Sequence, residues 1–101
     1  MKLLTKANCK ALPALYTQES KGDDAIAHVK FFTPDAQATW YATEFDGDDT
    51  FFGYCDLGYG SPELGCFSLS ELLKVRGKLG LPIERDRYFK PTTLAEVKKL
   101  H

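Results

Sequence analysis

The segment WYATEFDGDDTFFGY, residues 40–54, constrains the fold of this chain more than any other segment. It joins two runs rich in β-branched and aromatic residues, ATWYATEF (38–45) and TFFGYCDL (50–57), and such residues are enriched in strands. Between the runs stands Asp46-Gly47, a pair that tolerates the positive φ angles of a tight hairpin turn. The sequence therefore predicts a β-hairpin whose turn lies at residues 46–49.

Two further segments extend this hairpin into a sheet. In AHVKFFT (27–33) apolar residues recur at every second position, a period that is typical of a half-buried strand. ELGCF (63–67) follows the turn GYGSP (58–62) and is expected to be another strand. A short edge strand is expected near Tyr88-Phe89. We therefore predict an antiparallel meander of about four strands.

Helical signals flank the strands. Thr5 is the expected N-cap of a short first helix that Pro13 ends, because proline lacks a backbone donor. Ser68 and Thr93 each stand three residues before a glutamate, the spacing of a capping box. The last helix is expected to place three residues inside: Leu94, Val97 and Leu100. The polar stretch 17–25 is expected to be a loop. The predicted class is α+β, an antiparallel sheet with two to three short helices packed on one face.

The length of 101 residues fits one domain, residues 1–101. The chain begins MKLLTKANCK, which lacks the apolar run of a secretory leader, and no stretch approaches the ~20 apolar residues of a membrane helix. Its three cysteines are odd in number and far apart, which argues against a disulfide framework. We therefore expect a cytoplasmic protein that has no contact with membranes.

Charge is unevenly distributed along the sequence although the net charge is only −1. Residues 38–73 contain seven acidic residues and neither Lys nor Arg, whereas residues 74–101 contain eight basic and three acidic residues. Either these opposite charges neutralise each other within the fold, or one of the two segments faces a partner of opposite charge.

The sequence predicts no cofactor and no metal site. An EF-hand loop starting at Asp46 would need Gly at its sixth position and Glu at its twelfth, where this chain has Phe51 and Leu57. The cysteines and the two histidines lack the paired spacing of a zinc site. No phosphate-binding loop or nucleophile elbow is present either.

The strongest candidate site lies on the strand 38–45. Regular alternation would place Trp40 and Glu44 on one face and Tyr41 and Phe45 on the other. If helices cover the second face, Trp40 and Glu44 stay on the open face, where an exposed large apolar group suggests binding. The turn acids Asp46, Asp48 and Asp49 would then border this site. The alternative is that the terminal segments cover Trp40.

Arg85 is a further binding candidate, within the alternating charges Glu84-Arg85-Asp86-Arg87. Such alternation usually marks a solvated stretch whose charges pair with one another. The other interpretation is that its planar guanidinium binds a carboxylate or phosphate.

Several blocks, in order along nearly the whole chain, resemble a small bacterial family catalogued as domain of unknown function 2958: LLTKANCKALPALY, VKFFTPD, TWYATEFDGDDTFFG, ELGCFSLSEL and VRGKLGLPIERDRYFKP. The resemblance implies an accessory protein of plasmids and integrative elements, near DNA-processing or antirestriction genes. It implies no catalytic residues. The segment YCDLGYGSP looks specific to this chain, so no site common to the family is expected there.

We therefore expect a non-enzymatic binding protein, monomer or homodimer, that engages a basic protein partner through an acidic, aromatic sheet surface. An antirestriction role by mimicry of DNA is a variant, although the net charge is far weaker than that of a duplex. One alternative is nucleic-acid binding through the basic segment 74–101. The other is a carboxylate-dependent enzyme that pairs Glu44 with Glu63 or Glu84.

Overall fold

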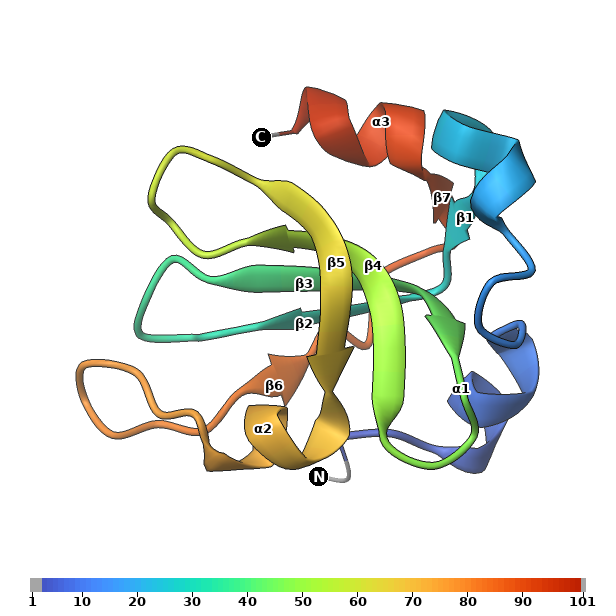
Figure 1. The fold of residues 1–101 in the computed structure, drawn as a ribbon. Coiled ribbons are helices and arrows are strands. Elements are labelled where there is room, and N and C mark those ends of the chain that lie inside the picture. The colour runs from blue at the N-terminus through green and yellow to red at the C-terminus, as the bar shows by residue number, and fades with distance from the viewer. Residues whose placement is uncertain (1–2, 101) are drawn as a thin grey trace.

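The computed structural model describes residues 3–100, which form an antiparallel sheet with short helices (Figure 1). The sheet has five strands in the order β5-β4-β3-β2-β6. Their bounds are Val29–Phe32 (β2), Thr39–Phe45 (β3), Thr50–Asp56 (β4), Glu63–Ser68 (β5) and Glu84–Arg85 (β6). The predicted α+β class and antiparallel sheet are confirmed, and β6 is a fifth strand.

The short edge strand lies earlier than predicted. Phe31 and Phe32 of β2 pair with Arg85 and Glu84, whereas Tyr88 and Phe89 lie in no strand. The predicted strand 27–33 is also divided. Ile26–Ala27 (β1) pairs with Thr92–Thr93 (β7) in a separate two-stranded sheet, and only β2 joins the main sheet.

Within residues 3–100, three α-helices and one 3-10 helix accompany the strands: Lys6–Ala11 (α1), Glu19–Asp24 (η1), Leu69–Lys74 (α2) and Leu94–Lys99 (α3). The predicted caps are confirmed, since Thr5, Ser68 and Thr93 each accept a backbone N–H three residues on. The prediction of a loop at residues 17–25 missed η1. Leu100 is 70% exposed, so its predicted place inside is wrong.

Buried side chains form one core on each face of the sheet. The first core contains Leu3, Leu12, Val29, Phe31, Trp40, Ala42, Phe45, Phe51, Phe67, Leu72 and Ile83. The second core contains Ala25, Ala27, Tyr41, Tyr54, Leu94 and Val97. Thus α2 packs on one face and α3 on the other, where a single covered face was expected. The reason is that β3 and β4 carry large side chains on both faces, so one layer cannot bury them all.

A β-bulge at Thr43 decides which residues of β3 share a face. Ala42 pairs with Gly53 and Glu44 pairs with Phe52, so Thr43 is an extra residue in the strand. Its hydroxyl donates to the carbonyl oxygen of Phe52 at 3.1 Å. Because an extra residue shifts the alternation by one, the residues after it exchange faces.

Candidate functional site

Trp40 and Glu44 lie on opposite faces of the sheet because of this bulge. Trp40 and Phe45 belong to the first core, whereas Glu44 lies beside Ala25 and Leu94 of the second. Trp40 is 7% exposed and Glu44 is 2% exposed. The hypothesis that they form one exposed site is therefore wrong, because Trp40 is buried in the first core and Glu44 is buried on the other face.

The carboxylate of Glu44 anchors the chain that leads into η1. Its Oε1 accepts the backbone N–H of Tyr16 at 2.9 Å, and its Oε2 accepts that of Gln18 at 2.8 Å. Tyr16 has a φ of 68°, a left-handed conformation that non-glycine residues seldom adopt. Both carboxylate oxygens of Glu44 are thus engaged in holding an irregular segment.

Acidic side chains of the turn between β3 and β4 also stabilise the fold through hydrogen bonds. Asp46 Oδ1 accepts the backbone N–H groups of Asp48, Asp49 and Thr50 at 2.8, 2.9 and 3.0 Å, respectively. Hydrogen bonds from the backbone of Asp48 and Thr50 lower the pKa of the Asp46 carboxyl. The carboxylate of Asp49 binds the N–H and the hydroxyl of Ser70 at 2.8 and 2.9 Å. The side chain of Asp48 is exposed.

Arg85 lies in β6, at the opposite edge of the sheet from β5. Its Nη1 donates to the carbonyl oxygen of Leu3 at 3.2 Å, which ties β6 to the N-terminal segment. The predicted binding residues therefore divide among the two faces, the hairpin turn and the far edge of the sheet.

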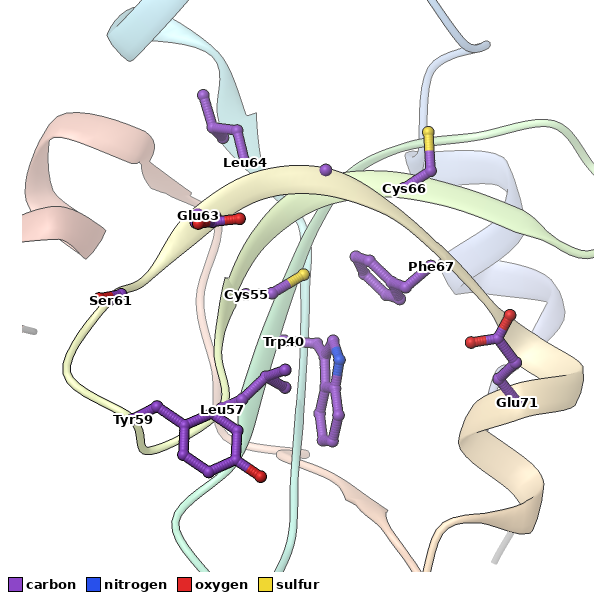
Figure 2. A pocket seen from close by; sticks show the side chains of 11 residues that line it. Trp40, Cys55, Leu57, Tyr59, Ser61, Glu63, Leu64, Cys66, Phe67 and Glu71 are labelled. Carbon is purple, nitrogen blue, oxygen red and sulfur yellow. The ribbon is translucent and has the colours of Figure 1, made fainter.

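A different surface offers a concave site. A groove of about 460 Å³ lies beside β5 on the face of the first core (Figure 2). We call it the β5 groove and define it by Trp40, Leu57, Tyr59, Glu63, Gly65 and Glu71. Figure 2 shows β5 arching over it, with Tyr59 near one end and Glu71 on α2 at the other.

Glycine at position 65 leaves the middle of the β5 groove open. Gly65 pairs with Gly53 across β4 and β5, so neither of the facing residues brings a side chain. A Cβ built on Gly65 would meet no atom within 4 Å. The absence of a side chain at position 65 therefore adds to the space of the groove.

The walls of the β5 groove combine apolar surface with acidic ends. Tyr59 is 86% exposed and Leu57 is 49% exposed, and both line the groove together with Trp40. The carboxylates of Glu63 and Glu71 are the charged groups that line it. A Lys or Arg side chain has a matching shape, since it carries a cation on an apolar stem.

Cys55 contributes a neutral thiol to this surface. The pKa of the Cys55 thiol is raised to about 11. Burial of the thiol is the larger cause, and electrostatic repulsion from the nearby Cys66 is the smaller one. Only a thiolate is a good nucleophile, so this environment opposes a catalytic role for Cys55.

The structure does not bring together the carboxylates of the predicted enzyme. Glu44 lies on the second core's face, Glu63 lies in the β5 groove, and Glu84 lies in β6. Within residues 3–100, no group of three or more His, Cys, Asp or Glu side chains is arranged to hold a metal ion.

The basic residues of segment 74–101 are spread over separate parts of the molecule. Lys74 ends α2, whereas Lys98 and Lys99 lie at the end of α3, on the other face of the sheet (Figure 1). Lys98 pairs with Asp23 at 2.6 Å and Lys99 with Glu96 at 3.2 Å. This arrangement argues against one continuous basic track, and neither of the paired acids belongs to the acidic segment 38–73.

The fold and the groove define an α+β domain with a concave, acidic and aromatic surface beside an edge strand. Residues 3–97 match the family model described as "Protein of unknown function (DUF2958)", so the chain belongs to this family. No curated protein and no solved structure matches it. None of the helices in the described part of the chain has the length and apolar character needed to cross a membrane.

Sequence reasoning missed most of the β5 groove. It identified Trp40 but set aside YCDLGYGSP, the segment that supplies Leu57 and Tyr59. The available signal was a tyrosine between two glycines in a turn, where an aromatic side chain has no core to enter. The open position Gly65 became informative only when the register with Gly53 was known.

Proposed function

We propose that this protein is a non-enzymatic binding module that holds a basic segment of a partner protein in the β5 groove. The observation that carries the proposal is the groove itself, an open apolar channel around Trp40 with carboxylates as its charged lining. Aromatic side chains in a concave site supply contact area, and Glu63 and Glu71 supply attraction for Lys or Arg.

The charge layout supports the same partner chemistry. Residues 38–73, which form β3, β4, β5 and most of α2, contain no basic residue that would compete for these carboxylates. A role in the biology of plasmids and integrative elements, antirestriction included, fits a module that binds basic proteins. Mimicry of DNA by the turn acids has less support, because Asp46 and Asp49 are engaged in hydrogen bonds of the fold.

The proposal is tested by selecting displayed random peptides on the protein. We expect enrichment of peptides with Lys or Arg beside aliphatic residues. Gly65→Leu, which adds a side chain in the middle of the groove without meeting another atom at its Cβ, should weaken their binding at least about tenfold. Binding should also fall in Glu63→Lys.

The matched control is Asp24→Lys, which makes the same change of charge on exposed η1. It should retain the affinity of the wild type. Selected peptides without basic residues, or peptides that bind Gly65→Leu as well as wild type, would contradict the proposal.

A further inference from the structure

The β5 strand forms one edge of the main sheet. It pairs with β4 on one side, and no strand of residues 3–100 pairs with it on the other. Natural sheets protect such edges with charged side chains, especially Lys, with Pro or with a bulge, and the one charged residue of β5 is Glu63. The sequence of β5, ELGCFS, contains neither Lys nor Pro, and its register with β4 is regular over all its pairs.

The free edge of β5 runs along the β5 groove. Glu63, Gly65 and Phe67 stand opposite Cys55, Gly53 and Phe51, so they share the face of the first core. Leu64 and Cys66 project away from Trp40 (Figure 2). A chain placed beside β5 would therefore direct every second side chain into the groove.

We propose that the partner's basic segment binds as an additional β-strand on the outer edge of β5. Its backbone would take up the free N–H and C=O groups of the edge, and its alternate side chains would enter the β5 groove. This inference rests on the proposed function and names the form in which the partner binds.

The groove also predicts a side-chain pattern for the bound strand. Glu63 lies at one end, Gly65 leaves space in the middle, and Glu71 lies beyond the other end of β5. Side chains on one face of a strand are two residues apart. The pattern that fits is basic, apolar, basic at every second position.

A second copy of this chain fits the edge less well. Pairing β5 with another β5 would bring Glu63 and Glu71 of both copies into one interface. No basic residue of segment 38–73 is available to offset that repulsion. Like charges opposed in this way disfavour association, so the occupant is a partner of opposite charge.

The test uses the capped peptide TKTVTKT and two N-methylated forms of it. In an extended peptide, the N–H groups of alternate residues face alternate edges. One form is methylated at its even-numbered residues and the other at its odd-numbered ones, so only one form blocks hydrogen bonds to β5. We expect one form to bind at least about tenfold more weakly than the parent peptide and the other to bind like it.

Amide hydrogen exchange gives an independent measurement of the same contact. The parent peptide should slow exchange at alternate residues of β5 in the wild type and leave it unchanged in Gly65→Leu. A composition control, TTKKVTT, breaks the alternation and should bind more weakly than TKTVTKT.

The outcomes separate the two proposals. Equal binding of the parent and both methylated forms, with loss in Gly65→Leu, would overturn strand addition and leave groove binding intact. No binding of the parent peptide, or equal binding to wild type and Gly65→Leu, would overturn both proposals.

Discussion

At the scale of single residues, Glu44 shows how the fold uses a buried carboxylate. Its two oxygens accept backbone N–H groups from a segment that enters η1 with a left-handed residue at Tyr16. Hydrogen bonds to a charged group contribute more than neutral ones, and an unsatisfied buried group is costly. Glu44 therefore stabilises the path of the chain between α1 and η1.

We predict that Glu44→Gln lowers the free energy of unfolding by about 1.5–3 kcal/mol, because the new amide nitrogen would face a backbone donor. Urea denaturation measures this change. Glu19→Gln, at an exposed position of η1, is the matched control and should behave like the wild type. Equal midpoints for Glu44→Gln and the wild type would show that these bonds contribute nothing.

Cys55 allows a second prediction at this scale. With a thiol pKa of about 11, roughly one molecule in a thousand carries the thiolate at pH 8. Iodoacetamide should then label the exposed Cys9 and Cys66 and leave Cys55 unmodified, as mass spectrometry of chymotryptic peptides would report. Labelling in urea is the control for intrinsic reactivity. Modification of Cys55 as fast as that of Cys66 would disprove the prediction.

The same shift has a consequence for stability. The folded state holds the Cys55 proton more tightly than the unfolded chain, whose thiol titrates near 9.0. The protonated Cys55 thiol therefore makes its full contribution to the free energy of unfolding below pH 9, and this contribution is lost as the pH rises towards about 11. Cys55→Ala should lose less stability than the wild type between pH 8 and 10.5, in parallel urea titrations.

At the scale of elements, the turn between β3 and β4 is joined to the start of α2. The carboxylate of Asp49 binds Ser70, and its carbonyl oxygen accepts the N–H of Leu69 at 2.8 Å. The hairpin thus supplies hydrogen-bond acceptors that a short helix cannot provide for itself.

Asp49→Ala should lower the free energy of unfolding by about 1 kcal/mol, because it removes acceptors from the first turn of α2. Asp48→Ala lies in the same turn and changes the net charge equally, yet it should stay within about 0.5 kcal/mol of the wild type. Thermal or urea unfolding of the two variants compares them. An equal decrease in the free energy of unfolding of Asp49→Ala and Asp48→Ala would show that the effect comes from net charge and not from capping of α2.

The elements also show what the sequence could and could not predict. The hairpin at Asp46-Gly47 and the caps Thr5, Ser68 and Thr93 were predictable because their signals are local. The bulge at Thr43 was not, because an extra residue becomes visible only against the register of β4. That single residue places Trp40 and Glu44 on opposite faces of the sheet, so the two do not form the predicted site.

At the scale of the whole molecule, Phe51 lies at the centre of the first core. Its ring packs against Phe31, Phe45 and Phe67 with centroids 5.5, 4.5 and 5.2 Å away. These three side chains come from β2, β3 and β5, so Phe51 connects most of the sheet. Phe51 thus joins side chains of four strands in one aromatic cluster.

Phe51→Ala should cost about 3–5 kcal/mol, a large share of the roughly 5–15 kcal/mol that stabilises a domain. The matched control is Leu79→Ala at a site that is 80% exposed, where little change is expected. Both are measured by urea denaturation at 25 °C. A loss below about 1 kcal/mol in Phe51→Ala would contradict the central position of this ring.

The position of Trp40 has a practical consequence. It is the only tryptophan of the chain, it lines the β5 groove, and it belongs to the first core. Its fluorescence emission therefore reports on the environment of the β5 groove alone. An unlabelled sample carries its own optical reporter of whether the groove is filled.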